Sequence, residues 1–261
     1  MSPQRALRDR LLVAVAALAA WQLATLAFGA HWVSPPVATA HRLLQLLASG
    51  ELWRHTQFTL AAAVGGFLVG GVPGALIPFA LRRLPRLAAV LDPYFVAGYG
   101  MPKLALAPLF ILWFGIGLAS KVALVASIVF FLILFATAAG VRGTDRRLVA
   151  MARVAGASEQ MVARHVVWPG AVPYIFAGLK ISLSYAIGAA VVGEMISSNR
   201  GLGYLIQAAS QDFDTTTVFA GLVALTGLIV VVNELVQTAE HWLLRWRPVD
   251  AQPERRLVIA A

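Results

Sequence analysis

The chain has 261 residues, of which 59% are hydrophobic and only 13% are charged. A soluble domain of this length carries about 25% charged residues, so the composition excludes an ordinary globular surface and indicates that lipid covers much of the protein. The chain contains no cysteine, which excludes disulfides, zinc–thiolate sites and cysteine nucleophiles. The length leaves no room for a separate catalytic module, so we expect a single transmembrane domain over residues 1–261.

Six apolar segments are long enough to span the membrane, since a helix needs about 20 apolar residues to cross roughly 30 Å of hydrocarbon. The first follows three arginines, as a signal peptide would, but its apolar run is longer than the usual 7–15 residues, so we interpret it as an uncleaved span. The third contains three prolines and is too long for one straight helix, so we expect a broken span there. The predicted spans are 11–28, 56–81, 87–117 (broken), 122–141, 173–196 and 215–239.

Basic residues divide unevenly between the two sides of these spans. If the N-terminus is cytoplasmic, the inner segments 1–10, 82–86, 142–171 and 241–261 hold 15 basic residues and the outer segments hold four. This bias fits the positive-inside rule for six spans with both termini in the cytoplasm. The net charge of +9 is then explained by topology, and we expect no nucleic-acid partner, which would need basic residues clustered on one folded surface.

The inner segment 142–171 is the longest one between spans, and its pattern differs from that of a linker. Thr144 or Asp145 is a candidate N-cap for a helix that continues to Ala155. Gly156 is a candidate end of that helix, because glycine adopts the left-handed cap conformation without strain. The segment therefore begins with a short helix that we expect to end in a glycine turn.

A second short helix follows the glycine turn. Ser158 is its candidate N-cap, and we expect Trp168-Pro169 to end it. Pro173 then falls near the first turn of the fifth span, where a proline is well tolerated. The whole pattern predicts a helical elbow that projects from the membrane and is rigid enough for a soluble partner to push on.

This segment resembles the conserved cytoplasmic loop of permease subunits of binding-protein-dependent ATP-binding-cassette importers. The family pattern is Glu-Ala-Ala, three residues, glycine, nine residues and Ile-x-Leu-Pro. Gly156 and Pro169 have the family's spacing, whereas Ala150-Met151-Ala152 lacks the glutamate and Trp168 replaces the leucine.

The resemblance extends over roughly 35–245 and is most specific for the nitrate, sulfonate and taurine group of these permeases. The other matching stretches are Pro102 to Leu109, Trp113 to Gly117, Gly156-Ala157-Ser158, Pro169 to Pro173, Gly178-Leu179-Lys180, Gly193-Glu194-Met195 and Gly201 to Tyr204.

The resemblance implies an all-α, multi-pass protein of the bacterial inner membrane with the type I importer permease fold. It also implies a homodimer with a second permease copy, two ATP-binding-cassette ATPase subunits and a periplasmic solute-binding protein. The implied cargo is a small anion such as a sulfonate, taurine or nitrate. Because the chain lacks a G-x-x-x-x-G-K-[ST] phosphate loop, we expect ATP and Mg to bind to the partner subunit, with no cofactor, metal or catalytic residue on this chain.

By resemblance, the elbow docks in a groove of the ATPase. The alternative is an ordinary loop helix with solvated arginines. The residues that we expect to form the coupling site are Leu148, Met151, Ala152, Arg153, Ala155, Gly156, Ala157, Ser158, Glu159, Arg164 and Pro169.

Four polar residues in the spans are candidates for the pathway or a gate, namely Lys103, Lys180, Ser184 and Glu194. A charge in the hydrocarbon costs about 2.5–3.5 kcal/mol on insertion scales, so such residues usually face a cavity or each other. A structural pair is the alternative for Glu194, and snorkelling to the interface is the alternative for the lysines. The glycines of the second span permit close helix packing, and Pro73 implies a kink there. We favour simple packing for these residues, with the rocking motion of alternating access as the alternative.

Two other classes of protein remain as alternatives. A secondary transporter driven by an ion gradient would show inverted repeats and paired charges at the membrane midplane, and neither is clear in the sequence. An intramembrane enzyme would need a nucleophile, a base or metal ligands that converge within the spans, and the scattered histidines do not provide this pattern.

Overall fold

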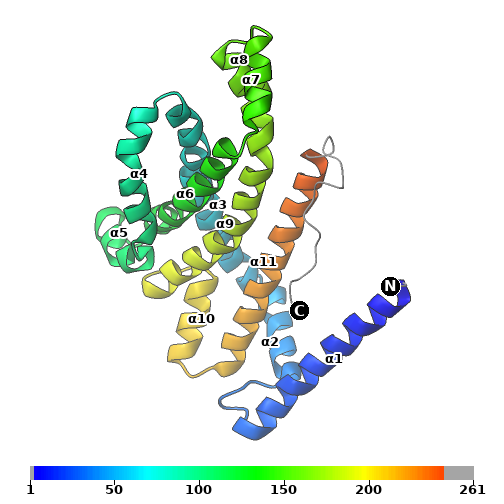
Figure 1. The fold of residues 1–261 in the computed structure, drawn as a ribbon. Coiled ribbons are helices and arrows are strands. Elements are labelled where there is room, and N and C mark those ends of the chain that lie inside the picture. Colours follow the sequence, from blue (N-terminus) through cyan, green and yellow to red (C-terminus); the bar gives the residue numbers. More distant parts are fainter. Residues whose placement is uncertain (1–2, 244–261) are drawn as a thin grey trace.

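The computed structural model describes residues 3–243, which contain helices and no strand (Figure 1). Four arginines counted in the predicted inner segment 241–261 lie outside this range, namely Arg245, Arg247, Arg255 and Arg256. In chain order the elements are α1 (Pro3–Phe28), α2 (Pro36–Ala48), α3 (Glu51–Arg82), α4 (Pro85–Gly100), the 3₁₀ segment η1 (Lys103–Leu106), α5 (Ala107–Phe114), α6 (Leu118–Arg142), α7 (Arg146–Val154), α8 (Glu159–Val162), the π-helical segment η2 (Ala163–Val167), α9 (Trp168–Ile196), α10 (Leu202–Gln211) and α11 (Thr215–Leu243).

Five helices of the described chain are long and apolar enough to cross a membrane, and a bent pair raises the number to six. The six predicted segments overlap these helices, although the segment 87–117 runs three residues past the end of the bent pair at Phe114. The bent pair is α4 with η1 and α5, which meet at an angle of 82°. Pro102 explains the break, because it lacks an N–H and forces the preceding Met101 into extended backbone with ψ 135°.

The core forms where α6 packs against both α3 and α9. Buried aliphatic side chains such as Val129 of α6 meet alanines of the neighbouring helices, including Ala63 and Ala190. Glycines bring the α3 backbone very close to α6, as predicted: a Cβ on Gly70 would lie 2.3 Å from the carbonyl oxygen of Ala126. Close backbone approach of this kind is typical of helix pairs in membranes.

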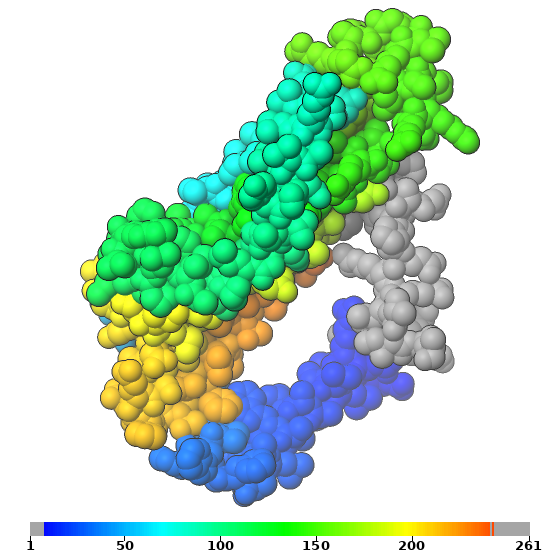
Figure 2. All heavy atoms as spheres, turned by 60° about the vertical axis from the view of Figure 1, so that its left-hand side comes forward, coloured from blue at the N-terminus to red at the C-terminus, as the bar shows by residue number. Residues whose placement is uncertain are grey.

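The first helix stands apart from this core. Figures 1 and 2 show α1 slanting away from the other helices, with open space beside its middle. Trp21 is its main attachment, since the indole N–H donates to the carbonyl of Ser34 (2.9 Å) and the ring stacks on Phe219 with centroids 5.7 Å apart. The following helix, α2, packs against α11, with Leu46 buried between them.

The predicted end of the second elbow helix at Trp168-Pro169 is wrong. Helices α8, η2 and α9 form one continuous helix over Glu159–Ile196. In its π-helical part the N–H of Trp168 donates to the carbonyl of Ala163, five residues earlier. This wider turn accommodates Pro169, which has no N–H to donate and needs room for its ring. Pro173 consequently lies inside α9 and not at the start of a new helix.

Candidate functional site

A helical elbow, residues 145–167, projects from one end of the bundle (Figures 1 and 2). Its first helix begins at Asp145, whose carboxylate accepts a hydrogen bond from the backbone N–H of Arg147 (2.8 Å). The helix ends at Gly156, which has a φ of +83°. The N–H of Gly156 donates to the carbonyl of Arg153, and the following N–H donates to the carbonyl of Ala152, both at 3.0 Å. This pair of bonds is a Schellman motif and confirms the predicted glycine turn.

The second helix of the elbow is also capped, because the hydroxyl of Ser158 accepts a hydrogen bond from the N–H of Met161 (3.3 Å). Glu159 then links the elbow to the bundle. Its carboxylate pairs with Arg153 of α7 at 2.7 Å and with Arg82 at the end of α3 at 3.6 Å. Exposed ion pairs contribute at most about 1 kcal/mol each, so the caps and the glycine turn set most of the elbow's geometry.

The elbow carries an exposed apolar face on α7. Val154 is 91% exposed and Met151 is 68% exposed, and Leu148 is also exposed. Met161 adds a further exposed apolar side chain from α8. Sequence reasoning selected Leu148 and Met151 but missed Val154, although its spacing of three residues from Met151 places it next to them on a helix. A rigid projection with such a face is suited to docking against another protein.

The remaining predicted elbow residues differ in their exposure. Ala152 and Ala157 are partly buried, whereas Arg153, Ala155, Gly156, Ser158, Glu159 and Arg164 are exposed. Pro169 lies beyond the elbow, in the first turn of α9. Their role in coupling stays a prediction.

Glu194 lies at the opposite end of α9 from the elbow and is only 1% exposed. One carboxylate oxygen accepts hydrogen bonds from the hydroxyl of Thr59 and from the backbone N–H of Gly203, both at 2.9 Å. The same hydroxyl oxygen accepts a hydrogen bond from the N–H of Leu202 (2.8 Å). Glu194 therefore joins α9 to α3 and to the first turn of α10, where a negative charge also interacts favourably with the helix dipole.

Gly201 is required beside this carboxylate. Its φ is +110°, and a Cβ built there would lie 2.1 Å from the carboxyl carbon of Glu194. The backbone N–H of Gly201 donates to Nδ1 of His55 (3.1 Å), and the His55 ring stacks on Tyr204 with centroids 5.8 Å apart. These contacts come from residues far apart in the sequence, which is why no local pattern indicated His55 or Thr59.

Lys121 is one of the four basic residues counted in the outer segments, and the sequence did not indicate that it is buried. The residue lies in the first turn of α6 and its side chain is 1% exposed. Its ammonium group donates to the carbonyl of Ser197 and to the hydroxyl of Ser120 (3.4 Å). The ammonium and the Glu194 carboxylate also attract one another electrostatically. A buried cation is stable here because backbone and side-chain oxygens replace its water.

The other three candidate pathway residues do not converge with Glu194. Lys103 donates to the carbonyl of Tyr99 (2.6 Å) and lies 4.8 Å from the ring centroid of Phe131. Lys180 forms an ion pair with Glu240 of α11. Ser184 accepts a hydrogen bond from Asn233 of α11 (3.4 Å). The roles of Lys103, Lys180, Ser184 and Glu194 in the pathway stay predictions. Across residues 3–243, no three acidic or histidine side chains are grouped closely enough to hold a metal ion.

This architecture is that of an importer permease. Residues 59–245 match the family of binding-protein-dependent transport system inner membrane components, and the chain belongs to this family. It is therefore a multi-pass protein of the inner membrane and an ATP-binding-cassette transporter permease, as the sequence motifs predicted.

Individual relatives agree with this assignment. The chain is 38% identical to the riboflavin transport system permease protein RibX of Chloroflexus aurantiacus, over 81% of this chain and 79% of that protein. It is 35% identical to the putative aliphatic sulfonates transport permease protein SsuC of Bacillus subtilis, over 91% and 87% of the two chains. It is 30% identical to the taurine transport system permease protein TauC of Escherichia coli, over 87% and 84%.

Solved structures with a similar fold confirm the predicted type I importer architecture. An inward-facing structure of the MetNI methionine transporter has a TM-score of 0.60 at 20% identity, and it covers 78% of this chain and 97% of that one. An amino acid ATP-binding-cassette transporter has a TM-score of 0.62 at 17% identity and covers 78% and 98% of the two chains. Identities this low support the fold alone.

Proposed function

We propose that two copies of this chain form the membrane pathway of an importer that receives a small solute from a periplasmic binding protein. ATP is hydrolysed on a separate subunit, which docks on the elbow from the cytoplasm. The observation that carries this proposal is the elbow itself, a doubly capped projection with an exposed apolar face at residues 148–154. A capped turn transmits a push from a partner, whereas a flexible loop would absorb it.

The cargo that we propose is a small anion of the sulfonate, taurine or nitrate type. Two relatives at 30–35% identity are named for aliphatic sulfonates and for taurine. Riboflavin is the second candidate, because the 38% identical relative is named for it. Uptake assays with the complete importer and each of these solutes separate the candidates, and uptake of none of them would contradict both.

Single cysteines test the docking surface and the topology together, since the natural chain has none. Val154→Cys places a thiol on the elbow, and Phe213→Cys places one in the turn between α10 and α11 at the other end of the bundle (Figure 1). Phe213 is exposed, so the two thiols are matched for access. We expect a membrane-impermeant thiol reagent to label only Phe213→Cys in cells whose outer membrane is permeabilised and whose inner membrane is intact.

The same pair tests the ATPase contact. When the chain is co-expressed with a candidate ATP-binding-cassette ATPase of its source organism, a thiol–amine cross-linker should join Val154→Cys to that subunit and should leave Phe213→Cys free. Labelling of Val154→Cys from outside the inner membrane would contradict the orientation. Solute uptake by the reconstituted chain without ATPase or ATP would favour the secondary transporter instead.

A further inference from the structure

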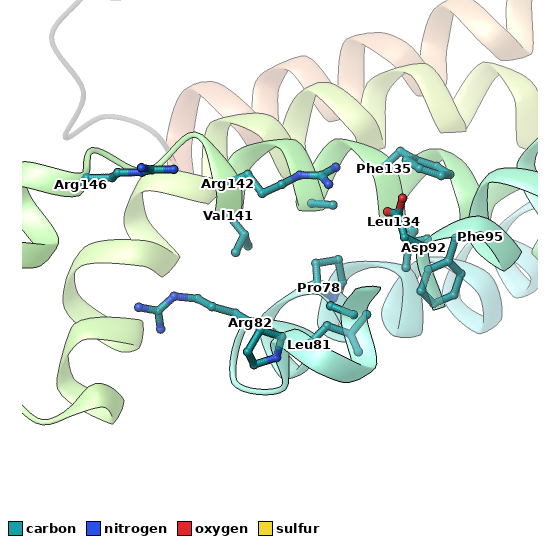
Figure 3. A pocket seen from close by; sticks show the side chains of 13 residues that line it. Pro78, Leu81, Arg82, Asp92, Phe95, Leu134, Phe135, Val141, Arg142 and Arg146 are labelled. Atoms are coloured by element: carbon teal, nitrogen blue, oxygen red, sulfur yellow. The ribbon is translucent and has the colours of Figure 1, made fainter. Parts of the chain in front are cut away.

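A cavity of about 490 Å³ lies beneath the elbow, between α3, α4 and α6. Apolar side chains form most of its wall, and four ionisable residues complete it. Figure 3 shows Arg82 and Arg146 at one end of the cavity, Asp92 and Phe95 at the other, and Arg142 between them. The thirteen lining residues are Pro78, Leu81, Arg82, Pro85, Ala88, Asp92, Phe95, Leu134, Phe135, Ala138, Val141, Arg142 and Arg146.

The three arginines come from three different elements. Arg82 and Arg142 lie in the last turns of α3 and α6, and Arg146 is the first residue of α7. Arg82 has a partial partner in Glu159 at 3.6 Å. Within residues 3–243, no acidic side chain lies within ion-pair distance of Arg142 or Arg146.

Charge in the cavity is therefore unbalanced, with three guanidinium groups against one carboxylate. Asp92 does not neutralise the arginines, because it forms no ion pair with any of them in the described chain and lies at the Phe95 end in Figure 3. Guanidinium groups bind phosphate through several parallel hydrogen bonds and are less strongly hydrated than ammonium groups. The part of the cavity that Arg82, Arg142 and Arg146 line is thus positively charged and attracts a phosphate group.

The apolar wall distinguishes a lipid from a free anion. Phe95, Leu134, Phe135 and Val141 form apolar parts of the cavity wall, and a small soluble anion would leave these side chains in contact with water only. An amphiphile fills both parts, because its phosphate meets the arginines while its acyl chains cover the apolar wall. Basic pockets between membrane helices are suited to the headgroups of anionic lipids for this reason.

We propose that this cavity binds an anionic phospholipid, with the phosphate in the part that the three arginines line and the acyl chains along the wall formed by α4 and α6. Such a lipid connects the first residue of α7 with the last turns of α3 and α6. It therefore supports the base of the elbow from below, close to the Arg82–Glu159 pair. The site is separate from the apolar face of the elbow and from the buried cluster around Glu194.

Native mass spectrometry of the full chain with phosphatidylglycerol or phosphatidylcholine tests this site. The wild-type chain should retain phosphatidylglycerol in preference to phosphatidylcholine. The double variant Arg142→Gln with Arg146→Gln should lose this preference by roughly thirtyfold, given the attraction of each arginine for an anionic lipid. The matched control is Arg83→Gln with Arg86→Gln, which removes two arginines from the α3–α4 turn outside this cavity and should change the preference by less than about threefold.

A second variant fills the cavity and leaves every charge in place. Ala138→Trp places a large side chain on the wall, and it should also remove the preference for phosphatidylglycerol in a chain that retains its helical circular dichroism. Equal losses in the two arginine pairs would mean a general surface attraction and would overturn the proposal. Displacement of phosphatidylglycerol by millimolar inorganic phosphate or glycerol 3-phosphate would assign the site to free anions and would overturn it as well.

Discussion

Substitution of Gly156 tests whether the fixed angle of the elbow matters for coupling. A Cβ built at this position meets no atom within 4 Å, and φ is +83°, so the cost of a side chain comes from the backbone conformation alone. A left-handed backbone costs about 1–2 kcal/mol for an ordinary residue and less for asparagine. A β-branched residue such as valine is a greater outlier there. A cost of one to two kcal/mol lowers the population of the native turn, relative to other conformations, by roughly 5- to 30-fold.

The assay combines co-purification of the ATPase with ATP-driven solute uptake by the reconstituted importer. We expect uptake to fall in the order glycine, asparagine, alanine, valine, with a roughly 5- to 30-fold loss for Gly156→Ala. Gly29→Val is the matched control, because Gly29 also has a positive φ of +89° and open space around it, but lies after α1 and away from the elbow. The thermal midpoint of the bundle reports whether each variant is folded.

Two results would contradict the proposed role of the elbow angle. If Gly156→Val is folded, retains the ATPase and takes up solute at the wild-type rate, the angle of the elbow does not matter for coupling. If Gly29→Val loses uptake to the same extent, strain anywhere in the chain has the same effect and the elbow has no special role.

Three further variants test the packing, the buried carboxylate and a helix cap. Gly70→Ala should lower the stability of the bundle by about 1–3 kcal/mol, because its Cβ would meet backbone atoms of α6. The loss should be measurable as a lower thermal midpoint. The control is Gly227→Ala in α11, which should leave the midpoint unchanged because nothing lies within 4 Å of the added Cβ. Glu194→Leu should cost about 1–3 kcal/mol by leaving buried donors unpaired, whereas Glu194→Gln keeps an acceptor. Loss of uptake in a stable Gln variant would support a direct pathway role for Glu194. Asp214 accepts hydrogen bonds from Thr217 at the start of α11, so Asp214→Ala should cost about 1 kcal/mol at neutral pH. Burial alone would raise the pKa of Asp214, but the hydrogen bonds from Thr217 hold it below its ordinary value of 3.8. The stability difference between the two proteins should therefore be complete above about pH 5 and should shrink as pH falls through the lower native pKa. A difference that grows in acid would refute this reasoning.

Local chemistry made the elbow predictable from sequence. The caps at Asp145 and Ser158 and the turn at Gly156 depend on residues within five positions of each other. Apolar run length likewise placed the spans, and the prolines of the third one indicated that it is broken. These features need no knowledge of the tertiary structure, because each is decided by the backbone of one short segment.

The failed predictions share a different physical origin. Pro169 predicts a helix end, because its ring and its missing N–H disturb an ordinary α-helix. A π-helical turn before it accommodates the proline, so the helix continues from Glu159 to Ile196. The sequence also did not indicate that Lys121, one position before the fourth predicted span, is buried. Its ammonium group donates to the carbonyl of Ser197, which lies more than 70 positions further along the chain. Contacts over such separations leave no periodic signal in a single sequence.

The continuous helix from Glu159 to Ile196 has a geometric consequence for the whole molecule. Its 38 residues measure roughly 57 Å at about 1.5 Å per residue, with the ion pairs of Glu159 at one tip and the hydrogen bonds of Glu194 near the other. A single rod that tilts about its middle swings its two tips in opposite directions. The displacement of the helix end at one face of the membrane and that of the end at the other face are then produced by the same rotation. Coupling between the two ends does not require a chain of side-chain rearrangements between them.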